Sequence, residues 1–289
     1  MTSDADKAEA HGQYVQTWNE LLDALFAYSW KEDLSRFRSN YVFRGLSNSG
    51  YELKTSLMRL GGEYWELERH LVRNFKKYAH RNVVEKDLIW NWLAVAQHHG
   101  LPTRLMDWTY SPFVAMHFAT CNLERFDVDG VVWCVDYVRT HELLPPVLRD
   151  VLENEGCNAL TLQMLSAGAG SIDEFDAMSM DPFVAFFEPP SLDDRIVNQY
   201  ALFSVLSSPR LSLDDWLLAH PELWRKIIIP AGLKWEIRDK LDQANVTERV
   251  LFPGLDGMCA WLKRNYSPGW RPRREENDLM HDGGNGFSK

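Results

Sequence analysis

Arg44 is the first residue of the chain whose surroundings suggest chemistry. It follows the β-prone residues Tyr41, Val42 and Phe43 and precedes Gly45. A guanidinium at a strand end can bind phosphate or ribose oxygens through its planar fork of donors, and a glycine beside it lets a ligand approach the backbone. We therefore predict ligand contacts at Phe43, Arg44 and Gly45. The competing interpretation is an arginine that a carboxylate holds for structure alone.

A second polar string runs from Thr103 to Trp108 within an apolar neighbourhood. Arg104 can bind an anion, Asp107 can orient a cation or act as a base, and Trp108 can stack on a base or a nicotinamide ring. The alternative is a structural ion pair between Arg104 and Asp107 beneath the indole.

His98 and His99 stand directly before the helix-breaking Gly100. One of them could act as a general acid or base, or donate to phosphate, whereas capping of the helix C-terminus fits equally well. Because adjacent helical residues point in different directions, at most one should face a site. No second cluster of ligands is visible, so no metal is expected.

Arg195 and Gln199 follow an acidic loop and precede an apolar run. A glutamine there can recognise an amide or the edge of a base through paired hydrogen bonds. The alternative is a glutamine that only satisfies the backbone of a neighbouring strand.

Hydrophobic periodicity and turn residues indicate which elements position these side chains. The expected helices cover residues 15–28, 63–78, 88–98, 212–216 and 233–241, and one begins at Ser111-Pro112, where serine caps and proline opens the first turn. The expected strands are 41–43, 130–138, 183–188, 201–206 and 226–229, with 103–108 as a short extended piece.

The mixture of helices and short strands without regular βαβ alternation favours an α+β fold, a small mixed or split β-sheet flanked by helices. We expect a disordered N-terminus over residues 1–12 and one domain over 13–266, with a helical insertion around 139–180. The Gly-, Pro- and charge-rich residues 267–289 are expected to be a flexible tail.

The composition limits the function classes. The chain has 289 residues, 45% hydrophobic content and 12 tryptophans, which excludes a largely disordered protein. Its net charge of −10 argues against broad binding to nucleic acid or to anionic membranes, although a local basic pocket remains compatible. The polar start, the absence of a long apolar run and four scattered cysteines lead us to expect a cytoplasmic protein with reduced thiols.

Three segments of the chain resemble the FRG domain family. They are YVFRG at 41–45, AQHHGLPTRLMDWTYSPFVAMHFA at 96–119, and RIVNQYALF at 195–203 followed by residues 227–257. The second segment is the most specific, because it is long and unusual and its spacing is fixed.

The order of these motifs also resembles that of the ADP-ribosyltransferase fold. That resemblance implies an arginine ending the first strand (Arg44), a Ser/Thr strand leading into a helix (from Thr103), and a third position near Gln199. Active enzymes hold a glutamate at the third position, so the amide of Gln199 puts transfer chemistry in doubt. The carboxylate would then come from Asp107 or, as second choice, Glu188.

Three functions are compatible with these residues. The first is an enzyme that acts on NAD or another nucleotide in the manner of ADP-ribosyl transfer, the second is a non-catalytic pocket for a nucleotide-like ligand, and the third is a protein-binding role in antiphage defence or a toxin system. The predicted catalytic residues are Arg44, His98, His99, Asp107 and Gln199. The predicted ligand contacts are Phe43, Gly45, Thr103, Arg104, Trp108 and Arg195.

Overall fold

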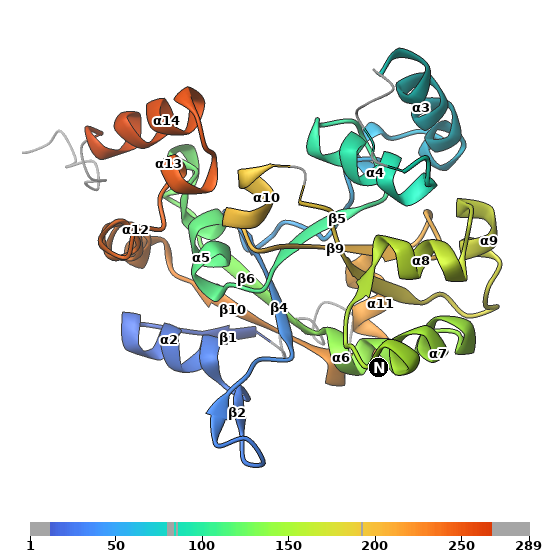
Figure 1. The fold of residues 1–289 in the computed structure, drawn as a ribbon. Coiled ribbons are helices and arrows are strands. Elements are labelled where there is room, and N and C mark those ends of the chain that lie inside the picture. Colours follow the sequence, from blue (N-terminus) through green and yellow to red (C-terminus); the bar gives the residue numbers. More distant parts are fainter. Residues whose placement is uncertain (1–11, 80–83, 85, 192, 268–289) are drawn as a thin grey trace, which may run out of the picture.

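An eight-stranded mixed sheet forms the centre of the protein in the computed structural model, which describes residues 12–79, 84, 86–191 and 193–267 (Figure 1). Its strand order is β1-β10-β6-β4-β5-β9-β8-β7. In that order the strands are Gly12–Tyr14, Trp224–Ile229, Gly130–Asp136, Tyr41–Leu46, Met106–Thr109, Ala201–Leu206, Val184–Glu188 and Leu160–Thr161. The pairs β1–β10 and β7–β8 are parallel and the rest are antiparallel. The predicted α+β class, with a mixed sheet flanked by helices, is confirmed.

The sheet is nearly divided between β4 and β5. Strand β4 pairs with β6 along all six of its residues, but with β5 only through Phe43 and Thr109. The strand at the second polar string begins at Met106, so Thr103 precedes it. The expectation that Thr103 lies on the strand beside Arg44 is therefore wrong, although the strands themselves are neighbours.

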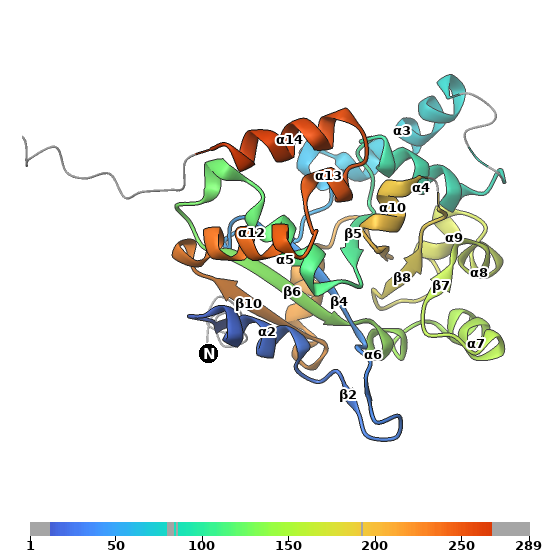
Figure 2. The same ribbon diagram turned by 60° about the vertical axis from the view of Figure 1, so that its left-hand side comes forward.

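Helices cover one face of each half of the sheet. Helices α2 (Trp18–Phe26), α5 (Pro112–Thr120) and α12 (Lys234–Gln243) share an apolar core with β4, β6 and β10. The helices around β8 and β9 share another core; they are α4 (Ile89–His98), α7 (Pro146–Glu155), α8 (Leu162–Gly168) and α9 (Ile172–Asp176). Figures 1 and 2 show these two groups at opposite ends of the sheet. The β4–β5 junction lies between them.

The second face of the sheet has its own core. Alternate residues of β4 and β6 point there, including Val42 and Trp133, and pack with Trp216 of α11 (Leu213–Leu218). The remaining elements are α3 (Tyr64–Tyr78), α6 (Tyr137–His141), α10 (Asp194–Asn198), α13 (Glu248–Leu251), α14 (Leu255–Asn265) and a small hairpin of β2 (Trp30–Lys31) and β3 (Arg36–Phe37).

Most predicted elements are present, and α5 begins as expected. The Ser111 hydroxyl accepts the Val114 amide at 3.3 Å, and Pro112 opens the first turn. One expectation needs correction, because Gly12 is in β1 rather than in a disordered terminus. Residues 139–180 are largely helical, as expected, and they also supply β7 and much of one apolar core. The expected disordered N-terminus, over residues 1–11, and the expected tail, over 268–289, lie outside the described part of the chain.

All four cysteines are free, with Cys134 buried and Cys259 exposed. In the described part of the chain, no helix is both long and apolar enough to cross a membrane. The same residues hold no group of three His, Cys, Asp or Glu side chains that could bind a metal ion.

The buried side chain of His141 predicts how the stability of the protein changes at acidic pH. Its Nδ1 lies 2.8 Å from the Asn158 carbonyl oxygen, and its Nε2 accepts the Phe186 amide at 2.9 Å. This geometry requires a neutral imidazole with the proton on Nδ1. Burial lowers the pKa of His141 from 6.5 to about 4, although the Asn158 hydrogen bond opposes the shift.

The unfolded chain therefore binds a proton at His141 between pH 6.5 and 4 that the folded chain does not. Its contribution to the free energy of unfolding is full above pH 6.5 and falls by about 3 kcal/mol towards pH 4. Urea denaturation between pH 4 and 7 measures this slope, and His141→Asn should flatten it. An identical slope in the variant would contradict the assignment.

Candidate functional site

A cavity of about 200 Å³ lies at the β4–β5 junction. Strand residues, helix α5 and the end of α10 all contribute to its wall. The lining residues are Phe43, Arg44, Gly45, Asp107, Trp108, Thr109, Phe118, Arg195, Gln199 and Ala201. The structure thus brings together seven residues that the sequence singled out from three distant segments.

Arg44 bridges the gap where the two strands diverge. If the β4–β5 register continued, Gly45 would pair with Asp107. Instead the Arg44 Nη1 donates to the Asp107 carbonyl oxygen at 2.5 Å, so a side chain replaces the missing backbone ladder. Its Nε is buried without a hydrogen-bond partner, and among the described residues no carboxylate forms an ion pair with it.

The charge of Arg44 is poorly compensated. Loss of hydration lowers the pKa of Arg44, the nearby Asp107 opposes this, and the positive charge of Arg59 lowers it further. An arginine stays protonated under such conditions, so the cavity wall carries a cation that lacks a counter-ion of its own.

Gly45 is required by packing rather than by a ligand. A Cβ at this position would lie 1.8 Å from the Ala115 carbonyl oxygen and 2.7 Å from the Ala119 amide nitrogen. The backbone of α5 therefore approaches β4 directly, and only glycine permits it. The close approach that we expected from a ligand is made by this helix, although Gly45 still lines the cavity.

Asp107 is an exposed carboxylate that the half-buried Gln97 and the buried Thr103 hold in place. The Gln97 Nε2 donates to its Oδ2 at 2.9 Å, and the Thr103 hydroxyl donates to the Gln97 Oε1 at 2.6 Å. Thr103 is fully buried and does not line the cavity, so its role is to fix Gln97 rather than to touch a ligand. Our reading of the sequence missed Gln97, which directly precedes the two histidines.

Gln199 and Arg195 form the wall opposite β4. The Gln199 Nε2 donates to the Leu251 carbonyl oxygen at 3.0 Å, and the Gln199 backbone carbonyl oxygen accepts from the Thr109 hydroxyl at 2.7 Å. Gln199 caps α10 immediately before β9. A glutamate here could not donate to Leu251, which explains why an amide suits this position.

Comparison with known families covers the N-terminal part of the chain that lines this cavity. Residues 39–128 match the FRG domain. The chain carries an FRG domain. Its limits enclose Arg44, Gln97 and Asp107, whereas Arg195 and Gln199 lie beyond them. No curated protein and no solved structure shows significant similarity to the chain.

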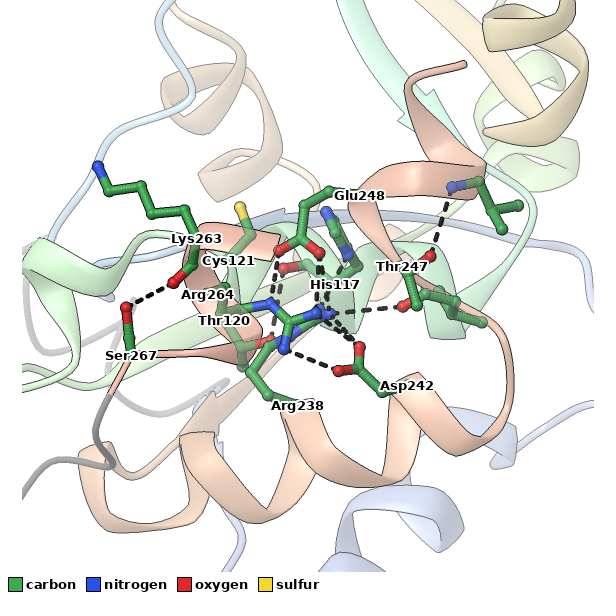
Figure 3. Close-up of polar contacts among 12 residues, drawn as sticks. His117, Thr120, Cys121, Arg238, Asp242, Thr247, Glu248, Lys263, Arg264 and Ser267 are labelled. Carbon is green, nitrogen blue, oxygen red and sulfur yellow. Dashed lines mark hydrogen bonds and ion pairs between the residues drawn. The ribbon is translucent and has the colours of Figure 1, made fainter. Parts of the chain in front are cut away.

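Helices that follow the FRG domain support the cavity wall from outside through a network of charges (Figure 3). Arg264 donates to both oxygens of Glu248 at 2.7 and 2.8 Å and to both of Asp242 at 2.9 and 2.6 Å. Arg238 lies 2.9 Å from the His117 Nδ1. Burial alone would raise the pKa of Glu248, but the Arg264 hydrogen bonds and the Arg238 charge hold it at about 2.

This network ties α12, α13 and α14 to α5, next to Phe118 in the cavity wall. Leu251 and Phe252 follow Glu248 at the end of α13. Leu251 accepts from Gln199, and the Phe252 ring lies 4.9 Å from the Arg195 guanidinium. The network therefore positions the wall that Gln199 and Arg195 form.

Arg104 does not belong to this cavity. Its Nε donates to Glu68 at 2.7 Å, and its Nη1 and Nη2 donate to Asp176 at 2.5 and 3.1 Å. It is only 5% exposed. The expected contact with a ligand anion is thus replaced by internal carboxylates, and its partner is not Asp107.

The indole of Trp108 also makes its contacts inside the protein core. It is 3% exposed, donates to the Ser204 hydroxyl at 2.8 Å and packs edge-on against Phe186. Trp108 belongs to the cavity lining, but its ring lies in the core of the second face, so the structure does not support the expected stacking on a ligand base.

Neither histidine of the FRG domain's second motif lines the cavity. His98 Nε2 lies 2.8 Å from the Asp193 carboxylate, which joins the end of α4 to the start of α10. The His99 ring packs against that of His98. The convergence of one histidine on the site is therefore not observed.

Proposed function

We propose that the cavity binds a nucleotide-like ligand through a phosphate at Arg44, and that the protein acts on NAD in the manner of ADP-ribosyl transfer. The observation that carries the proposal is the Arg44 guanidinium, which lines the cavity with a buried, unpaired Nε and no carboxylate partner among the described residues. A cation withdrawn from water normally has a partner, and a bound phosphate would supply it.

Asp107 supports the catalytic part of the proposal. Cleavage of NAD breaks the bond between ribose C1′ and the nicotinamide nitrogen, which keeps the electron pair. The ribose becomes oxocarbenium-like and needs a nearby negative charge. Asp107 is exposed in the same cavity, and the hydrogen bond from Gln97 leaves its Oδ1 free to accept a proton from the attacking nucleophile.

Gln199 favours a second candidate, a binding pocket without chemistry. Its amide carries no charge and is engaged by Leu251. Incubation with NAD separates the two functions, because an enzyme releases nicotinamide and a binding pocket retains NAD intact.

Arg44→Ala tests the shared part of both candidates. We expect ADP-ribose to bind about 100-fold more weakly, since a buried charge-assisted contact is lost. The free energy of unfolding should fall by less than the roughly 3–5 kcal/mol of a broken buried ion pair, because Arg44 has no such pair among the described residues. Calorimetric titration and urea denaturation measure these effects.

Arg36→Ala is the matched control, because Arg36 is exposed on β3 and is not among the residues that line the cavity. Unchanged ADP-ribose binding by Arg44→Ala, together with a loss of several kcal/mol in stability, would show that Arg44 is structural.

A further inference from the structure

A second cavity, of about 530 Å³, adjoins the first. The two share Arg44, Gly45 and Phe118, so Arg44 is a wall of both cavities. The segment that follows β4 forms the outer wall, and it includes Tyr51 and Arg59.

The walls of this second cavity are cationic. Arg44, Lys54 and Arg59 face a single carboxylate, Glu52, which leaves an excess of two positive charges. The chain as a whole has a net charge of −10, so this local excess runs against its average. Glu52 lies 2.5 Å from Lys54, and both side chains are about half-exposed.

Arg59 is the least compensated of these cations. Its guanidinium is exposed and has no hydrogen bond or ion pair among the described residues. Its charge is close enough to Arg44 to disfavour the charged form of that side chain. The positive charges of Arg59 and Arg44 repel each other, and an anion bound by both would relieve that repulsion.

We propose that the second cavity is a phosphate subsite, in which Arg59 and Lys54 bind one phosphate of a diphosphate whose other phosphate lies against Arg44. The proposal rests on the proposed function and names its substrate class. The ligand is a nucleotide with two linked phosphates, rather than a nucleoside or a monophosphate. The shared wall at Arg44 allows one guanidinium to contact both phosphates through its several donors.

Calorimetric titration of the full chain with ADP-ribose and with AMP tests this subsite. Arg59→Ala should weaken ADP-ribose binding by about 10-fold, the usual effect of one charge-assisted hydrogen bond, and AMP binding by less than about 2-fold. Glu52→Gln should tighten ADP-ribose binding by up to about 5-fold, because it releases Lys54 from an exposed ion pair. Arg36→Ala should change neither ligand.

The outcomes separate this inference from the proposed function. Equal effects of Arg59→Ala on both ligands, or no effect on either, would overturn the diphosphate subsite. If Arg44→Ala still weakened ADP-ribose binding by about 100-fold in that case, the proposed function would stand without the diphosphate subsite. Failure of the unaltered protein to bind either ligand would overturn both.

Discussion

Asp107→Asn is expected to slow the release of nicotinamide from NAD by about 100-fold, typical of the loss of a general acid–base group. Asparagine has the same shape and its oxygen can still accept from Gln97, so the cavity should keep its geometry. What is lost is the negative charge beside the developing oxocarbenium and the proton acceptor for the nucleophile. The measurement is the initial rate of nicotinamide release at saturating NAD.

Asp150→Asn provides the control for the same chemical change, because Asp150 is exposed on α7 and far from the cavity lining. Binding of ADP-ribose should be unchanged or tighter in Asp107→Asn, since a negative charge has left an anion site. A variant that turns over NAD at the normal rate would remove Asp107 from the mechanism, whereas the absence of nicotinamide release from the unaltered protein would favour the binding pocket.

Arg104→Ala is expected to lower the free energy of unfolding by about 3–5 kcal/mol, because it leaves a buried carboxylate without its partner. Glu68 is 2% exposed and would lose its ion pair with Arg104 at 2.6 Å, the one such pair that it forms within the described part of the chain. Asp176 is 27% exposed and can regain water, so Glu68 dominates the loss. Urea denaturation followed by tryptophan fluorescence measures the change.

Arg69→Ala is the control, since Arg69 pairs with Asp173 at the surface and such pairs contribute about 0–1 kcal/mol. The double variant Arg104→Met/Glu68→Met removes both charges and should be more stable than Arg104→Met alone. If the double variant were the less stable of the two, the buried pair would not be the source of the effect.

The elements of the fold could be predicted where the signal is local. Ser111-Pro112 marks the start of α5 through its own cap, and β9 over Ala201–Leu206 has the predicted limits. Arg44 and Asp107 were found because each is a polar residue beside apolar strand residues. Alternation along β5 also places Asp107 and Thr109 on one face and Trp108 on the other, which would have separated the indole from the cavity.

The rest depends on contacts between residues far apart in the chain. Glu68 and Asp176 lie 36 and 72 positions from Arg104, so no local pattern indicates that they occupy its guanidinium. Leu251 is 52 positions from Gln199, and the short helices α13 and α14 that bring it there were not predicted. A charged residue in an apolar string therefore predicts burial or function but does not distinguish them.

Three neighbouring residues have three different roles in the structure: Phe43, Arg44 and Gly45. Phe43 is 1% exposed and fills the core beneath α5, Gly45 makes room for the backbone of that helix, and Arg44 alone presents a charge to the cavity. In another chain of similar sequence, the phenylalanine and the glycine would therefore report only that the strand and helix pack in this way. The presence of the arginine would indicate whether that chain has the cationic group of the proposed ligand site.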